Sequence, residues 1–91
     1  MSEGEAIYVG SKPIMSYVTA VITALQRADS VRIMARGRAI SNAVDAVEVT
    51  RRSFMKDIIV DDISIGTERI GEGADVRNVS TIAIRLSRGK S

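Results

Sequence analysis

A glycine between two arginines, at the junction of a strand pattern and a helix pattern, is the feature of this sequence that most restricts its fold. Residues 31–35 alternate apolar and longer side chains, as a half-buried strand does. Over residues 39–54 the apolar side chains recur at helical spacing instead. Between these patterns, Gly37 permits a tight turn after Arg36 and before Arg38. The stretch therefore predicts a strand, a sharp turn and a helix.

The same turn is suited to bind an anion. A helix that begins near Ala39 leaves its first amide groups unpaired, at the positive end of the helix dipole. The planar guanidiniums of Arg36 and Arg38 beside such amides match the geometry of a phosphate. The alternative is a solvated turn that happens to contain arginine. The local residues alone leave both interpretations open.

Patterns before this junction predict one more strand and one more helix. Residues 6–9 have the composition of a short strand and end at a glycine. An apolar stripe runs through residues 13–28 at helical spacing, with Ser11 as a candidate cap and a proline in the first turn. Within this helix we expect Tyr17 to pack in the core. We also expect Asp45, in the second helix, to hold the arginine turn (residues 36–38) in place.

Two further strands follow the second helix. Residues 58–65 favour a strand that Asp61 and Asp62 interrupt, which indicates a bulge or an exposed edge. Residues 66–78, the arm, are rich in glycine and charge and predict a mobile hairpin, and residues 81–86 form the last strand. The expected fold is α/β, a two-layer sandwich of order β-α-β-α-β-β. Two helices cover one face of a mixed four-stranded sheet.

Length and composition define one domain over residues 1–91, with flexible tails at residues 1–5 and 88–91. The chain has no Cys and no His, which removes thiolate chemistry, the commonest metal ligand and the commonest general base. We expect no enzyme, no cofactor and no metal. A remote alternative is a Mg²⁺-dependent nuclease that uses Asp61, Asp62 and Glu68. With no apolar run of membrane length and no signal-peptide pattern, a cytoplasmic chain without membrane contact is expected.

Charge is segregated along the chain although the net charge is only +2. Residues 32–56 contain six basic and two acidic side chains, whereas residues 57–75 contain one basic and six acidic ones. Ten of the thirteen basic residues are Arg, which favours bidentate contact with phosphate. A chain of this kind can bind a polyanion on one face without being basic overall.

Three motifs together resemble the Alba family of small archaeal chromatin proteins. They lie at residues 9–18 (VGSKPIMSYV), 35–45 (ARGRAISNAVD) and 79–82 (VSTI), and the resemblance extends from Ile7 to Leu86. It implies a homodimeric protein, associated with the chromosome, that binds double-stranded DNA and also RNA with little sequence preference. The same fold family includes RNA-binding subunits of ribonuclease P-type particles. The alternative is therefore a protein that acts chiefly on RNA.

The resemblance also implies which residues face the nucleic acid: Ser11, Lys12, Arg36, Gly37, Arg38, Asn42, Arg69 and Arg77. Independently, the apolar side chains of Phe54 and Met55 are left over by a small sheet with two helices and predict contact with another copy. In the family, the main dimer contact lies near the second helix and the last two strands. An aromatic residue like Phe54 lies between dimers on DNA.

This chain departs from the family in two places. The family often has two lysines where Ser11 and Lys12 stand, and the first of them is an acetylation site, so Lys12 becomes the candidate for acetylation. An acetyltransferase or a deacetylase would then be a further partner. In the arm, Glu72 and Asp75 repel phosphate, which shifts the expected contact to Arg69 and Arg77 at its base.

Overall fold

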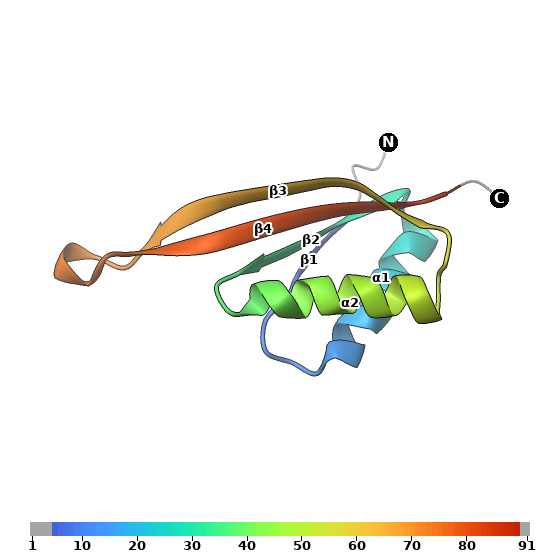
Figure 1. Ribbon diagram of the computed structural model, residues 1–91, viewed down its shortest axis with the longest axis horizontal. Coiled ribbons are helices and arrows are strands. Elements are labelled where there is room, and N and C mark those ends of the chain that lie inside the picture. The colour runs from blue at the N-terminus through green and yellow to red at the C-terminus, as the bar shows by residue number, and fades with distance from the viewer. Residues whose placement is uncertain (1–4, 90–91) are drawn as a thin grey trace.

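Residues 5–89, which the computed structural model describes, form two layers (Figure 1). Their elements follow the order β1 (Glu5–Tyr8), α1 (Ile14–Arg27), β2 (Ser30–Arg36), α2 (Ala39–Ser53), β3 (Ile58–Ile70), a short 3-10 helix η1 (Gly73–Asp75) and β4 (Arg77–Arg88). Both α-helices cover the same face of the sheet (Figure 1). The predicted α/β sandwich is therefore confirmed, including the order β-α-β-α-β-β. None of these helices is long and apolar enough to cross a membrane.

The sheet is mixed, and its strands lie in the order β1-β2-β4-β3. β1 and β2 pair in parallel around the crossover helix α1, whereas β4 is antiparallel to both β2 and β3. The hairpin β3–β4 extends well past the end of the helices (Figure 1). One face of the sheet packs against the helices. The opposite one, the open face, is covered by no other layer of residues 5–89.

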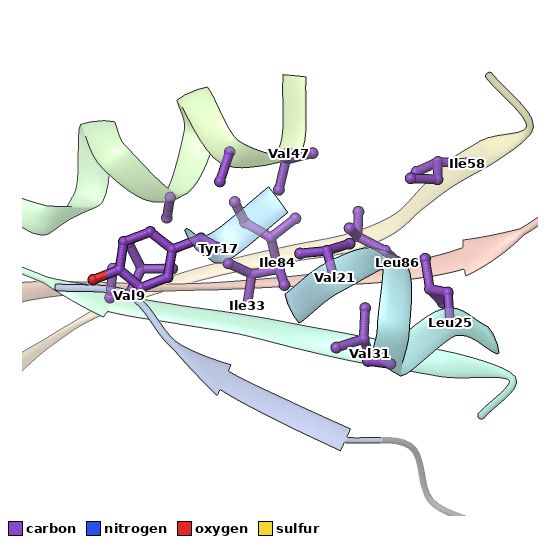
Figure 2. Packing of buried hydrophobic residues seen from close by; sticks show 14 residues of the cluster. Val9, Tyr17, Val21, Leu25, Val31, Ile33, Val47, Ile58, Ile84 and Leu86 are labelled. Carbon is purple, nitrogen blue, oxygen red and sulfur yellow. The ribbon is translucent and has the colours of Figure 1, made fainter. Parts of the chain in front are cut away.

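The core lies between the helices and the sheet and consists mainly of aliphatic side chains (Figure 2). Val31, Ile33 and Leu86 of the sheet are fully buried. On α2, Ala43 and Ala46 are also fully buried, and their small size lets the helix approach the strands closely. Tyr17 packs in this core as expected. The same layer of apolar side chains fixes the start of each helix relative to the sheet.

β3 contains the irregularity that the two aspartates predicted. Val60 pairs with Leu86 and Asp62 pairs with Arg85, so Asp61 is an extra residue and forms a bulge. β3 is also the edge strand of the sheet. Beyond the bulge the pairing is regular to Ile70.

The arm is more regular than the sequence indicated. Residues 66–70 and 77–78 were expected in a mobile hairpin but are paired strands, and the turn between them comprises only residues 71–76. These residues show no strand pattern because neither side of this ribbon is buried, so no alternation of apolar residues is required. Backbone pairing alone defines these strands.

Three local expectations also need correction. Glu5 begins β1 and Arg88 ends β4, although both were assigned to loose tails. Each is held by an exposed ion pair, Glu5 with Arg27 at 2.8 Å and Arg88 with Asp57 at 3.0 Å. The rest of the expected tails, residues 1–4 and 90–91, lies outside the described residues. Ser11 does not cap α1, because the helix starts after Pro13 with no side-chain cap.

Candidate nucleic-acid interface

The Lys12 loop, residues 10–13, lies between β1 and α1, and hydrogen bonds to the Tyr17 side chain fix its backbone. The backbone amides of Gly10 and Lys12 both donate to the Tyr17 hydroxyl, at 2.8 and 3.0 Å. Because the Tyr17 ring is buried, this hydroxyl is a firm anchor for the loop. The side chains of Ser11 and Lys12 remain exposed. The loop therefore presents the Lys12 ammonium to solvent from a defined backbone.

Asn42 joins this loop to α2. Its side-chain amide donates to the backbone carbonyl of Gly10 at 3.0 Å. Since Asn42 lies about one turn into α2, the contact brings the Lys12 loop next to the arginine turn. Sequence reasoning placed Asn42 among the nucleic-acid contacts. The structure uses its amide group inside the protein, where it positions the loop.

The arginine turn has the backbone that Gly37 was expected to permit. Gly37 has φ 59°, a conformation that side chains with a Cβ rarely adopt. Its amide donates to the Ser80 carbonyl of β4 at 2.8 Å, and its own carbonyl accepts from the Ile40 amide at 3.2 Å. These two bonds hold the turn, whereas Asp45 is exposed and forms no ion pair within residues 5–89. The strand, the turn and the helix start at Ala39 are confirmed.

The starts of the two α-helices share an electrostatic property. Neither has a side-chain cap, and neither has an acidic residue in its first turn. The positive ends of both helix dipoles are therefore not offset by a local carboxylate. Lys12 precedes the N-cap residue of α1, and Arg38 is the N-cap residue of α2. Both are exposed and form no ion pair within the described residues. Fixed amides and free cations of this kind suit a phosphate backbone.

Arg36 does not share that site with Arg38. Its Nη1 lies 2.7 Å from Oε1 of Glu68 in the hairpin. Because Ala35 faces the core, strand alternation directs Arg36 to the open face of the sheet. The expectation that both guanidiniums flank the first amides of α2 therefore fails for Arg36. The sequence pattern could not show this, since Glu68 is remote along the chain.

The two arginines of the arm lie on opposite sides of it. Arg69 is paired with Asn78, and Arg77 is paired with Ile70, which is the adjacent position in the ladder. Successive positions face opposite ways, so Arg77 continues the open face and Arg69 continues the helix-covered face. Both are exposed, as are the acidic residues Glu72 and Asp75 at the tip.

The apolar residues expected to contact another copy differ in their exposure. Phe54, at the end of α2, is 53% exposed, whereas Met55 packs partly against the core. Beyond the bulge, Ile63 and Ile65 are 57% and 83% exposed. They pair with Ile84 and Ile82 and so lie on the helix-covered face of the sheet. Sequence reasoning counted Ile63 and Ile65 only as strand residues.

The carboxylates of the nuclease alternative do not form one site. Asp62 accepts a hydrogen bond from the Ser64 hydroxyl at 3.0 Å, and Glu68 is bonded to Arg36. Asp61 is the extra residue of the bulge. Within residues 5–89 there is no group of three or more acidic, His or Cys side chains that could hold a metal ion. The geometry gives this alternative no support.

Taken together, these features define a small two-layer α/β protein with exposed cations at two adjoining helix starts and along a projecting hairpin. The Alba family model matches residues 5–67 of the chain. The chain belongs to the Alba family.

Its relatives are similar over almost their whole length. "DNA/RNA-binding protein Alba" of Methanothrix thermoacetophila is 49% identical, and the match covers 97% of this chain and 100% of that protein. "DNA/RNA-binding protein Alba 1" of Archaeoglobus fulgidus is 48% identical over 91% of this chain and 94% of its own. The solved structure of Alba from Thermoplasma volcanium matches with a TM-score of 0.83 and 43% identity, covering 91% of this chain and 99% of that one.

Proposed function

We propose that the protein binds double-stranded DNA without sequence preference, as a homodimeric chromatin protein that coats or compacts DNA, and that it also binds RNA. The observation that carries the proposal is the hydrogen bond from Asn42 to Gly10, which joins the Lys12 loop to the first turn of α2, so that two uncapped helix starts adjoin. The names of the relatives from Methanothrix thermoacetophila and Archaeoglobus fulgidus support nucleic acid as the ligand.

Lack of sequence preference follows from the kind of contact. Lysine, arginine and helix-start amides bind phosphate oxygens, which position a protein on DNA but contain no sequence information. In this proposal Lys12 and Arg38 are the central contacts, with Ser11 and the backbone of Gly37 beside them. Arg69 and Arg77 extend the contact along the arm, one on each of its sides. Such a protein would be cytoplasmic and associated with the chromosome.

Homodimerisation follows from the apolar surface around α2. Ile63 and Ile65 are exposed together with Val44, which is 41% exposed on α2. Ile40 and Ile65 line one shallow depression between α2 and the hairpin. A second copy would remove these side chains from water. Phe54, at the far end of α2, is then available for contact between dimers on DNA, with Met55 beside it.

Regulation by acetylation is a further part of the proposal. Lys12 is exposed, and its ammonium lies before the uncapped start of α1. Acetylation would remove the charge of Lys12 and weaken phosphate contact. An acetyltransferase and a deacetylase would then be additional partners.

A chain acting chiefly on RNA is the second candidate, because the same relatives are named for both nucleic acids. The experiment is competition for the protein between a fluorescent 30-base-pair DNA of mixed sequence and unlabelled competitors. We expect unrelated duplexes to compete equally, and structured RNA of equal length to compete no better than duplex DNA. Stronger competition by the RNA would favour the second candidate. Absence of binding to either nucleic acid at low salt would refute both.

The ion pair between Arg36 and Glu68 predicts a gain of affinity on mutation. In Glu68→Gln, Arg36 loses its carboxylate partner and becomes available to a phosphate near the arginine turn. Because an exposed pair of this kind contributes roughly 0.2–1 kcal/mol, duplex affinity at low salt should rise by about 1.4- to 5-fold for each subunit that contacts the DNA. The measurement is fluorescence anisotropy with one duplex.

The matched control for this change is Glu48→Gln. It breaks a similar exposed pair, Glu48 with Arg51 at 2.8 Å, at the opposite end of α2 from the arginine turn, and it changes the net charge equally. An equal gain of affinity in both variants would mean that only net charge matters. No gain in Glu68→Gln would mean that Arg36 does not reach the DNA.

A further inference from the structure

The open face of the sheet displays rows of side chains that the strand register specifies. One row contains Arg32 of β2, Arg85 of β4 and Asp62 of β3. The next row contains Tyr8 of β1, Met34 of β2, Ala83 of β4 and Ser64 of β3. Neighbouring rows lie about 7 Å apart along the strands. In residues 5–89 no helix or loop packs over this face (Figure 1).

Tyr8 stands on this face as an exposed aromatic ring. It is 73% exposed, the largest exposure of any aromatic residue in the described part of the chain. An aromatic side chain in a sheet is ordinarily buried or packed between neighbours, because its ring gains most from removal from water. Tyr8 instead borders a hollow of about 670 Å³ over the sheet. Small residues are among those that line this hollow: Ser64, Gly66, Thr81 and Ala83.

Two like charges lie directly opposite each other in the adjacent row. Arg32 and Arg85 are cross-strand partners, both are exposed, and neither forms an ion pair within residues 5–89. Like charges at this separation destabilise a sheet, and an anion bound between them would remove the repulsion. The acidic groups on this face are Asp62, which accepts from Ser64, and Glu68, which is bonded to Arg36. Arg32 and Arg85 therefore form a cationic pair on this face that is not neutralised by an ion pair within residues 5–89.

We propose that the open face binds single-stranded RNA, with one unpaired base stacked on Tyr8 and a backbone phosphate between Arg32 and Arg85. An aromatic ring beside a cationic pair is the combination that single-stranded nucleic acid requires, because every base has a face that stacks. A duplex cannot use it, since its bases are stacked on one another. The hydroxyls of Ser64 and Thr81 line the same hollow on the strands β3 and β4, across the sheet from Tyr8. They provide hydrogen-bonding groups for the 2′-hydroxyl of a neighbouring nucleotide, which favours RNA over DNA.

This inference rests on the proposed nucleic-acid binding but uses a different surface. Lys12 and Arg38 precede the helices, whereas Tyr8, Arg32 and Arg85 lie on the side of the sheet that the helices do not cover. One protomer has the whole open-face site. Loss of one type of binding should therefore leave the other intact.

The test uses the fluorescence of the protein itself. The chain has two tyrosines and no Trp, and Tyr17 is buried but anchors the Lys12 loop. The part of the emission change that is absent in Tyr8→Phe therefore reports Tyr8. Titration with a 12-nucleotide oligouridine should quench the emission, and the oligodeoxyuridine of equal length should bind more weakly. Tyr8→Ser should lower affinity for oligouridine by about 5-fold or more, whereas Tyr8→Phe keeps the ring and should retain it.

Two further variants test the arginine pair. Arg85→Gln should reduce the log–log salt slope for oligouridine by about 0.7, the value for one phosphate contact on a single strand. Arg52→Gln, at the end of α2, removes the same charge elsewhere and should not change the slope. Duplex DNA affinity should stay within 2-fold, about the error of the assay, in Tyr8→Ser, since the proposed duplex contacts exclude this residue.

Several outcomes would overturn the inference while leaving the proposed function standing. These are unchanged oligouridine affinity in Tyr8→Ser, equal binding of the deoxy strand, or dissociation of the dimer by Tyr8→Ser, which would make the open face an interface between copies. Equal loss of duplex and oligouridine binding in Tyr8→Ser would also overturn it. Failure of the unmodified protein to bind duplex DNA would count against the proposed function instead.

Discussion

Replacing Lys12 and Arg38 together by alanine is expected to remove about half of the salt dependence of duplex binding. Each phosphate contact contributes about −0.9 to the slope of log affinity against log salt. A dimer with about eight contacts, four cationic side chains from each subunit, should lose roughly 10⁴ in affinity between 50 and 200 mM salt. The double variant removes four contacts per dimer, so its slope should flatten by about 3.6 and its loss over the same range should be only about 10²-fold.

The fold should tolerate this change, because both side chains are exposed and form no ion pair within residues 5–89. The matched control is Arg52→Ala with Lys56→Ala, which removes the same charge at the opposite end of α2. Anisotropy titrations at four salt concentrations give the slopes, and thermal unfolding checks the fold. If the control flattens the slope as much as the double variant does, the helix starts are not the binding surface.

Ile65→Asp is expected to convert the protein from a dimer to a monomer. Ile65 is 83% exposed, so an isolated protomer leaves almost the whole side chain in water. Burial of an isoleucine contributes about 1.5–3 kcal/mol, and a symmetric dimer buries two. The dimer dissociation constant should therefore rise by about 10²- to 10⁴-fold, since about 1.4 kcal/mol corresponds to a factor of ten.

Sedimentation equilibrium at micromolar concentration measures this change. Ile59→Asp is the matched control, because Ile59 is also an exposed residue of β3, at 47%, but pairs with Ser87 on the open face. It should remain a dimer. A wild-type monomer, or a dimeric Ile65→Asp protein, would refute the proposed contact. A monomeric Ile59→Asp protein would indicate that the dimer contact lies on the open face of the sheet instead of the helix-covered face.

Local patterns were sufficient to predict most of the fold. Residues 31–54 specify a strand, a glycine turn and a helix by periodicity alone, and the turn has the positive φ that Gly37 permits. Asp61 and Asp62 predicted the bulge and the edge because charged residues rarely interrupt a buried strand. The paired part of the arm was missed since both of its sides are exposed, and period and burial then give no signal.

The candidate site was less predictable, because its arrangement depends on pairs of residues that are distant in the chain. Asn42 with Gly10 and Arg36 with Glu68 are each separated by 32 positions. No spacing rule reports such contacts. Tyr8 was missed for a different reason: in a short strand at the edge of the sheet, one aromatic residue gives no indication of which face it occupies. Only the register with Met34 places it on the open face.

The bulge at Asp61 has a consequence for how related chains could diverge. It separates β3 into a segment that completes the core, with Ile58 buried, and a segment whose apolar side chains Ile63 and Ile65 are exposed. An extra residue in one strand increases the local twist and bends the hairpin. Deleting Asp61 would leave the pairs Val60–Leu86 and Asp62–Arg85 in place and remove that bend. A single residue, Asp61, therefore sets the angle between the hairpin and the rest of the sheet. This angle determines the curvature of a partner that the hairpin can follow, and it can change without a change in the core.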